Sequence, residues 1–309
     1  MSFSSEVKEE LEKQIGKSRH CQLAELAALF GYCGKLESKG LDTYFELATE
    51  HAGLAKKCYT LIKKAFGFSP ELVTEGSCVL RITDQEELHK ILEALKFLTG
   101  DGVLHPLRGP VNGLLLQKSC CTRAFVRGCY LAAGSMSNPN KAYHFEVVCS
   151  TMEQAMQLRD IMRSYETDAK IVERKNHYVV YLKEGAQIVD MLNVMEAHVA
   201  LMNLENVRIL KEMRNSVNRK VNCETANINK TVTAAVRQIE DITYIKEQLG
   251  LNKLPENLRE IAEVRLEYPE APLKELGELL DPPVGKSGVN HRLRKLGEIA
   301  ERLRSGNTV

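Results

Sequence analysis

The chain is 309 residues long, with 44% hydrophobic and 27% charged residues and a formal net charge of +1. This balance is typical of a soluble globular protein of two domains and excludes a disordered or fibrous chain. The longest apolar runs are far shorter than the ~20 residues that cross a bilayer, and the N-terminus is acidic where a secretory signal is basic, so we expect a cytoplasmic protein without membrane contact.

Two nine-residue segments, LAALFGYCG at 26–34 and VRGCYLAAG at 126–134, begin an internal repeat. Identical residues then recur at a spacing of 100: Gly34 and Gly134, Phe45 and Phe145, and Glu46 and Glu146. A spacing that is kept over several pairs indicates a duplicated unit. Two copies in one chain predict pseudo-two-fold symmetry.

The same elements are predicted in both copies. The first is a helix that ends at the glycine, where we expect the left-handed conformation that often closes a helix. It is followed by a strand, a helix, a pair of strands and a closing helix, which together predict an α+β fold. These four elements are expected at 44–49, 54–66, 72–82 and 84–99, and again at 144–150, 153–165, 169–182 and 187–204.

Small residues on the first helix of each copy would let two helix backbones approach closely. They are Ala27, Ala28, Gly31 and Gly34 in the first copy, and Gly128, Ala132, Ala133 and Gly134 in the second. Packed side by side, these helices would form the seam between two saddle-shaped sheets. The alternative is a pair of ordinary core helices that use small residues.

The two nine-residue segments resemble the paired LAGLIDADG helices of homing endonucleases. In that family the residue before the terminal glycine is an acid that holds a divalent metal over the scissile phosphate, because hard cations take oxygen ligands. Cys33 and Ala133 occupy these positions here. The nearest carboxylates, Glu25 and Glu37, lie a turn or more away on the first helix. We therefore expect a nuclease fold without nuclease chemistry, whose saddle is left for DNA or protein contact.

Nine cysteines occur without a C-x-x-C pair, and eight histidines form no H-E-x-x-H spacing. An odd number of cysteines without paired spacing argues against a disulfide framework and a zinc ribbon. Cys120 and Cys121 are adjacent, and the other seven are scattered among apolar positions. We expect buried, reduced thiols, no metal and no cofactor.

Residues 205–222 are rich in asparagine and basic side chains, with five bases and one acid in 208–221. Within this stretch Arg214, Arg219 and Lys220 suit the phosphate oxygens of DNA. The sequence therefore predicts a basic linker that contacts DNA. The alternative is a solvated connector, which is what a run of charges usually is.

Four amphipathic helices are predicted after the linker. They are expected over 228–249, 254–268, 272–280 and 287–304. Ser287 is the expected N-cap of the last helix, whose apolar face consists of Val289, Leu293, Leu296, Ala300 and Leu303. A short helix, a tight turn and a helix with polar first turns are typical of a helix-turn-helix, whose second helix lies in the major groove of DNA.

The outward face of the last helix holds the candidate DNA contacts. They are Lys286, Ser287, Asn290, His291, Arg292, Arg294 and Lys295. Arginine pairs with guanine and asparagine with adenine, whereas Lys286 and Arg292 are better placed for phosphates. No acid lies within 282–297, which favours a polyanion partner over a simple packing unit.

Across essentially the whole chain, the sequence resembles the bacterial WhiA family. The stretches that carry this resemblance are 2–11, 134–139 and 273–296. The resemblance implies a transcriptional regulator that is linked to sporulation, cell division or chromosome segregation, is associated with the nucleoid and is not an enzyme. The implied partner is double-stranded DNA at promoter regions, and a regulatory protein partner is left open.

The expected organisation is a LAGLIDADG-like domain at 1–204, a basic linker at 205–222 and a helix-turn-helix domain at 223–309. Two other interpretations stay open. One is a division-associated or nucleoid protein that binds DNA with little sequence preference. The other is an active endonuclease, which the side chains at Cys33 and Ala133 oppose.

Overall fold

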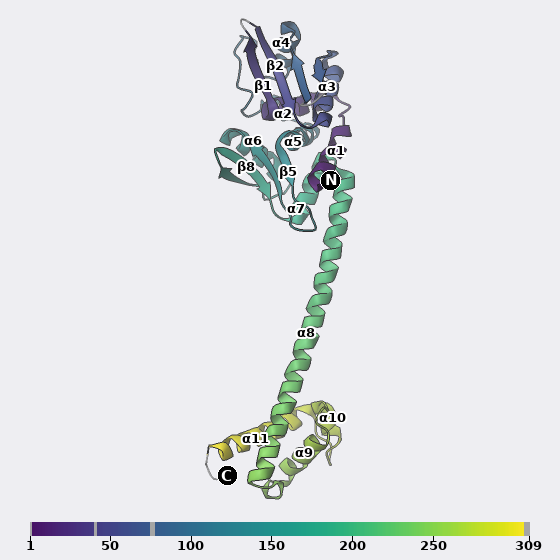
Figure 1. Cartoon of the computed structure of the whole chain (residues 1–309), viewed down its shortest axis with the longest axis vertical. Coiled ribbons are helices and arrows are strands. Elements are labelled where there is room, and N and C mark those ends of the chain that lie inside the picture. Colours follow the sequence, from purple (N-terminus) through teal and green to yellow (C-terminus); the bar gives the residue numbers. More distant parts are fainter. Residues whose placement is uncertain (1, 40–41, 75–77, 306–309) are drawn as a thin grey trace. The chain divides into compact units, whose positions relative to one another are not determined.

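The computed structural model describes residues 2–39, 42–74 and 78–305. The chain forms two compact units, Met1–Lys211 and Glu212–Val309, whose helices and strands are labelled in Figure 1. Helix α8 (His198–Gln248) contributes residues to both units. Within the described ranges, no helix combines the length and the apolar composition that crossing a bilayer requires.

The first unit contains a short helix, α1 (Phe3–Lys13), and two copies of one α+β motif. The first copy consists of α2 (Arg19–Cys33), β1 (Gly34–Lys39), β2 (Asp42–Thr49), α3 (Ala52–Phe66), β3 (Glu71–Val73), β4 (Cys78–Ile82) and α4 (Gln85–Ala94). The second consists of α5 (Ser119–Ala133), β5 (Gly134–Met136), β6 (Phe145–Cys149), α6 (Met152–Arg163), β7 (Lys170–Arg174), β8 (His177–Leu182) and α7 (Gly185–Met195). A 3₁₀ turn at Gly113–Leu116 precedes the second copy.

Each copy builds an antiparallel sheet with the same strand order, β1-β2-β4-β3 in the first and β5-β6-β8-β7 in the second. Equivalent ring pairs fill the two cores. Phe30 stacks on Phe45 with ring centroids 3.8 Å apart, and Tyr130 stacks on Phe145 at 5.3 Å. The duplication and the α+β class that the sequence predicts are therefore confirmed.

The glycine after the first helix of each copy does not adopt the predicted left-handed conformation. Gly34 has φ −80° and ψ 157°, and Gly134 has φ −90° and ψ 153°, so both are extended and begin strands β1 and β5. A Cβ at Gly34 would lie 2.3 Å from the ring of Phe45, and a Cβ at Gly134 would lie 2.3 Å from the ring of Tyr130. Close ring packing, rather than backbone conformation, requires glycine here. Strands β1 and β5 themselves were not predicted from the sequence.

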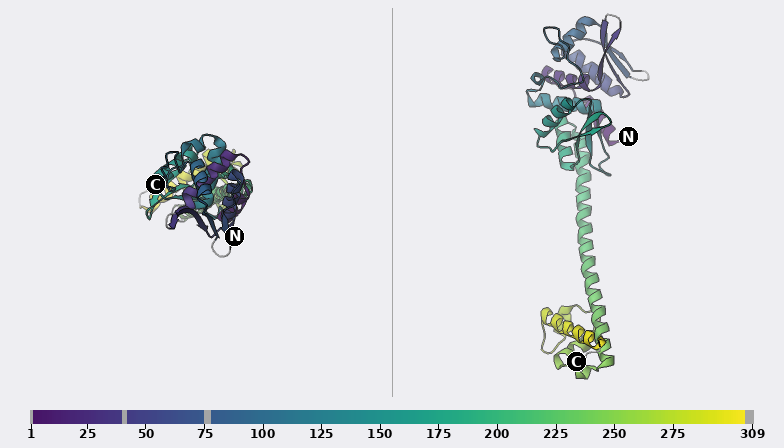
Figure 2. Two further views of the ribbon diagram at one scale, coloured as in Figure 1. Left: turned by 90° about the horizontal axis from the view of Figure 1, so that it is seen from above. Right: turned by 90° about the vertical axis from the view of Figure 1, so that its left-hand side faces the viewer.

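Helices α2 and α5 pack side by side at the boundary between the two copies, as Figures 1 and 2 show. A Cβ at Gly128 would lie 2.8 Å from Cβ of Ala28 and 2.9 Å from the carbonyl oxygen of Glu25. The small residues therefore allow the close backbone approach that their pattern predicts.

Both closing helices are shorter than predicted. Helix α4 ends at Ala94, and the chain turns at Lys96, which has φ 61°. Helix α7 ends at Met195, because Glu196 adopts the left-handed conformation with φ 68° and its N–H donates to the Asn193 carbonyl. Such a residue closes a helix and redirects the chain, here into α8.

The described part of the second unit, up to residue 305, is all α. It consists of the later part of α8, a 3₁₀ turn (Leu251–Lys253), α9 (Glu256–Glu267), α10 (Leu273–Glu278) and α11 (Lys286–Arg304). The predicted apolar face of α11 is confirmed, since it packs in the core of this unit beside Ile242 and Ile245 of α8. Its buried members are Val289, Leu293, Leu296 and Ala300, and Leu303 packs against them.

The segments predicted as a linker at 205–222 and a separate helix at 228–249 are both parts of α8. The sequence of α8 contains neither glycine nor proline, so no residue in it interrupts the helical hydrogen bonds. The run of charges in 205–222 favoured a connector, but the backbone there is α-helical. Apolar side chains are nevertheless exposed along it, at Leu210, Met213, Val217, Val221, Ile228 and Val232.

Candidate nucleic-acid interface

Helices α10 and α11 and the turn between them form a helix-turn-helix. The turn is tight, because a Cβ at Gly277 would lie 2.0 Å from the carbonyl oxygen of Val284. Gly285, and not Ser287 as predicted, is the N-cap of α11. Gly285 is extended with ψ 158°, and its carbonyl accepts from the N–H of Val289 at 3.1 Å. The helix therefore begins about two residues earlier than its sequence suggested.

Most of the predicted contacts lie on the exposed face of α11. Lys286, Ser287, Asn290, His291, Arg294 and Lys295 are all exposed. Arg294 forms an ion pair with Glu298 at 3.4 Å on the same helix, but its side chain is 73% exposed. A pair this exposed is weak, so the guanidinium can exchange it for a partner.

Arg292 differs from its neighbours. Its side chain is 20% exposed, and Nη1 lies 3.5 Å from Oε2 of Glu260 and donates to the Asn257 carbonyl at 3.4 Å. Both partners belong to α9. Arg292 thus ties α11 to α9 instead of projecting with the other predicted contacts.

A basic groove beside this face was not predicted from the sequence. It has a volume of about 330 Å³ and brings together Lys230 of α8, Lys274 of α10, and Lys286 and Asn290 of α11. Its lining residues, all within the described part of the chain, include no acid. Lys230 and Lys274 were missed because each looks like an ordinary solvated base on its own helix, and only tertiary packing brings them to α11.

Two bases of the 208–221 stretch are engaged within the first unit. Arg208 pairs with Glu205 at 2.8 Å. The Nζ of Lys211 donates to the carbonyl of Pro139 at 2.6 Å. The Arg208 pair lies within α8, and the Lys211 contact anchors the start of α8 to the second copy.

Arg214, Arg219 and Lys220 are exposed on α8. At about 100° per residue, Arg219 lies ~140° and Lys220 ~120° around the helix from Arg214. The helix therefore does not gather these three predicted contacts on one face.

The positions of the family's catalytic acids lie at the C-terminal ends of α2 and α5. The Sγ of Cys33 donates to the Leu29 carbonyl at 3.1 Å, and burial raises the pKa of this thiol to about 12 although Lys8 and Arg108 oppose the rise. Ala133 offers no ligand atom in its side chain. Two cationic side chains and a protonated thiol are a poor environment for a hard divalent cation.

The two nearby carboxylates do not replace the missing acids. Glu25 is fully buried and lies 2.6 Å from Nζ of Lys57, and it accepts from Nε and Nη2 of Arg127 at 3.0 and 3.1 Å. Burial lowers the pKa of Lys57, and the attraction of Glu25 opposes this shift. Glu37 was wrongly predicted on the first helix, since α2 ends at Cys33 and Glu37 lies on β1 opposite Tyr44. Glu25 is thus committed to an ion-pair network within the seam.

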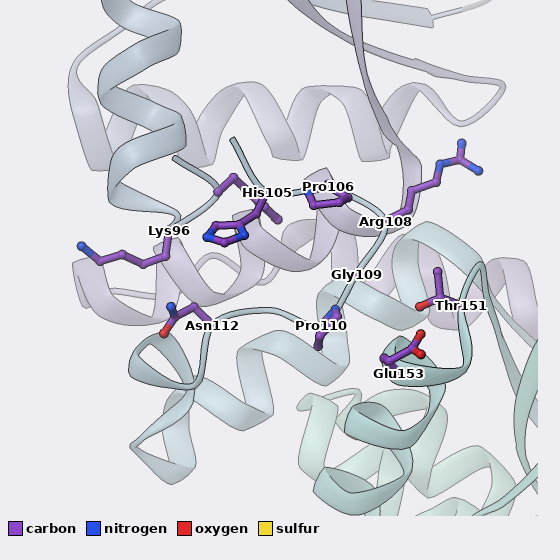
Figure 3. A pocket seen from close by; sticks show the side chains of 10 residues that line it. Lys96, His105, Pro106, Arg108, Gly109, Pro110, Asn112, Thr151 and Glu153 are labelled. Carbon is purple, nitrogen blue, oxygen red and sulfur yellow. The ribbon is translucent and has the colours of Figure 1, made fainter. Parts of the chain in front are cut away.

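The loop between the copies borders a depression of about 470 Å³. Figure 3 shows His105, Pro106 and Arg108 along this loop, with Thr151 and Glu153 near the start of α6. Its lining mixes cationic and acidic side chains and suggests no single ligand chemistry.

Four potential metal ligands meet at the N-terminal ends of α2 and α5. They are His20, Cys21, Cys120 and Cys121, whose donor atoms all lie within 4.8 Å of one another. The sequence gave no sign of this group, because a search for short ligand spacings does not detect residues that lie about one hundred positions apart, in the two copies of the repeat.

The prediction that the cysteines are buried is wrong for Cys120 and Cys223, which are exposed. All nine cysteines are free thiols.

The fold and these residues define a LAGLIDADG-like protein with a C-terminal helix-turn-helix domain. Three sequence-family models match the chain. The WhiA N-terminal LAGLIDADG-like domain matches residues 19–87, the WhiA LAGLIDADG-like domain matches 122–214, and the WhiA C-terminal HTH domain matches 217–300. The chain belongs to the WhiA family.

Curated relatives agree over almost the full length. The chain is 53% identical to a "Probable cell division protein WhiA" of Lachnoclostridium phytofermentans, with 98% of this chain and 100% of the relative covered. It is 52% identical to the protein of the same name from Alkaliphilus oremlandii, with 99% of each chain covered. Among solved structures, full-length DUF199/WhiA from Thermatoga maritima matches with a TM-score of 0.58 and 26% identity, covering 98% of this chain and 99% of that one.

Proposed function

We propose that the protein is a sequence-specific DNA-binding transcriptional regulator that acts in cell division, with residues 223–309 as its DNA-binding domain. The exposed, acid-free first half of α11, continued by the basic groove at Lys230 and Lys274, carries this proposal. The helix-turn-helix match supports DNA as the polyanion. The names of the curated relatives support a role in division.

In this proposal, α11 enters the major groove with its N-terminal half. Asn290 and Arg294 read base edges, since an amide suits adenine and a guanidinium suits guanine. Lys286, Lys230 and Lys274 contact phosphates and set the register of the helix on the duplex. Ser287, His291 and Lys295 lie on the same exposed face and complete the interface. Promoter regions, within the nucleoid, are the proposed targets.

We also propose that the LAGLIDADG-like unit has no nuclease activity. Cys33 and Ala133 occupy the positions where the family fold carries its acids, and Glu25 is bound by Lys57 and Arg127. Cleavage through a divalent metal requires oxygen ligands that can reach the ion.

Selection from a library of random duplexes tests the DNA-binding proposal. The full chain should enrich one sequence motif, and chromatin immunoprecipitation with sequencing should find that motif upstream of genes. Even coverage of the chromosome without an enriched motif would favour the interpretation of a nucleoid protein with little sequence preference. No measurable binding to any duplex at low salt would overturn the proposal.

A further inference from the structure

The N-terminal ends of α2 and α5 form a cluster that the DNA-binding proposal does not use. We propose that His20, Cys21, Cys120 and Cys121 bind one zinc ion, which joins the two copies of the LAGLIDADG-like unit at their seam. This site lies at the opposite end of the helices from Cys33 and Ala133. It is therefore distinct from the position of the nuclease metal in the endonuclease fold.

The distances fit a tetrahedral site. Nδ1 of His20 lies 3.2 Å from Sγ of Cys121, 3.3 Å from Sγ of Cys21 and 3.9 Å from Sγ of Cys120. Zinc bonds of about 2.3 Å to sulfur and 2.0–2.1 Å to nitrogen place neighbouring ligand atoms roughly 3.5–3.8 Å apart in a tetrahedron. Small side-chain adjustments therefore suffice to surround one ion.

The internal symmetry explains how the cluster arises. His20 and Cys21 are the second and third residues of α2, and Cys120 and Cys121 are the second and third residues of α5. Because α2 and α5 pack against each other at the seam, each dipeptide faces its equivalent from the other copy. A helix N-terminus also favours negative charge, and hence bound thiolates.

The surroundings suit a structural ion. Cys121 is buried in a small apolar cluster with Ala24 and Ala124, whereas Cys120 is exposed. The site therefore has an apolar floor and an open side through which an ion can enter. Three thiolates and an imidazole are a known ligand set for structural zinc, whereas magnesium and calcium prefer oxygen.

Metal content and cobalt spectroscopy of the full chain, produced without a histidine tag, test this proposal. After dialysis against metal-free buffer, we expect about one zinc ion per chain. Replacement by cobalt should give the strong visible bands and the thiolate charge-transfer absorption of tetrahedral cobalt. The variant Cys120→Ser with Cys121→Ser should lose both signals, and the control Cys223→Ser, an exposed cysteine of α8, should keep them.

A second variant remains informative if the double substitution prevents folding. His20→Cys converts the set to four thiolates, so it should keep about one metal ion per chain and strengthen the charge-transfer absorption of cobalt. Three outcomes would overturn the proposal. They are wild-type protein that takes up no zinc or cobalt, full binding in the double variant, and a disulfide between cluster cysteines in freshly isolated protein. DNA binding is measured separately, so failure of the zinc site would leave the proposed function standing.

Discussion

Charged side chains are buried and paired in the seam of the first unit, whereas they are exposed on the outer face of α11. In the seam, the side chains of Glu25, Lys57 and Arg127 are at most 3% exposed, and the carboxylate lies 2.6 Å from Lys57 and 3.0 Å from Arg127. On α11, Lys286 and Lys295 are exposed. A buried ion must be paired because its desolvation costs several kcal/mol, whereas an exposed base costs little and stays available to a partner.

The sheets of the first unit also carry ion pairs, but these are partly exposed. Arg81 of β4 pairs with Glu46 at 2.7 Å, whereas in the second copy Tyr181 stands opposite Glu146, and the base near that acid is Arg174 of β7, at 3.6 Å. The first unit thus pairs many of its bases with its own acids. Bases of the second unit pair with acids too, such as Arg304 with Asp241 at 2.7 Å. The exposed, acid-free first half of α11, and not a lack of ion pairs, therefore favours polyanion binding by the second unit.

The largest expected effect comes from breaking the buried network. Glu25→Ala leaves Lys57 and Arg127 without their shared counter-ion, and removing one partner of a buried pair typically costs about 3–5 kcal/mol. The free energy of unfolding of the full chain, measured in urea by circular dichroism, should fall by this amount in the transition of the first unit. Glu37→Ala, on an exposed strand position, is the control and should change it by less than ~0.5 kcal/mol. Equal, small losses in both variants would show that the network does not stabilise the seam.

A smaller change in free energy is expected when a proposed base-reading residue of α11 is replaced. Arg294→Ala should weaken binding to the selected duplex by about 1–3 kcal/mol and relax the preference at one base pair. Arg302→Ala, also exposed on α11 but in its last turn, should leave affinity almost unchanged. Fluorescence anisotropy on selected and scrambled duplexes measures both. Identical losses on the two duplexes would contradict a base-reading role.

The groove lysines should act without regard to sequence. Lys274→Ala and Lys230→Ala, like Lys286→Ala, should weaken selected and scrambled duplexes alike, because each removes a phosphate contact. Each should reduce the slope of log K against log salt by about 0.9. Lys246→Ala, an exposed base elsewhere on α8, is the matched control. An unchanged salt slope in the groove variants would exclude the groove from the interface.

The basic residues Arg214 and Arg219 of α8 should contribute less to DNA binding than the groove lysines. Arg214 and Arg219 lie ~140° apart around the helix, so a duplex that runs along one side of α8 reaches at most one of them. Charge reversal at both positions in the full chain should therefore change the salt slope by no more than about 0.9. A change of twice that size would show that DNA contacts α8 on both sides.

The protein is expected not to cleave the DNA backbone. Incubation of long duplexes with the protein and Mg²⁺ or Mn²⁺ should yield no double-strand cuts, because Cys33 and Ala133 supply no oxygen ligand. A parallel reaction with chelator is the control. Reproducible cleavage that the chelator abolishes would show that other carboxylates hold a metal.

Local patterns in the sequence were enough to predict part of the architecture. The duplication follows from pairs such as Gly34 and Gly134, and the core face of α11 follows from the spacing of Val289, Leu293 and Leu296. Both depend on residues that are near in sequence or repeat at a fixed interval, so no tertiary information was needed. Where a local rule competed with packing, the prediction was wrong. Gly34 is extended because the ring of Phe45 fills the space of a side chain.

Tertiary structure alone decided which distant groups meet. Lys230 and Lys274 reach α11 only because three helices pack together, and His20 and Cys21 meet Cys120 and Cys121 only because α2 and α5 pair at the seam. The buried state of Glu25 has the same origin, since its partners Lys57 and Arg127 come from α3 and α5. A sequence determines what each side chain can donate, accept or ligate. The free energy of packing the whole unit decides which of those groups come within bonding distance.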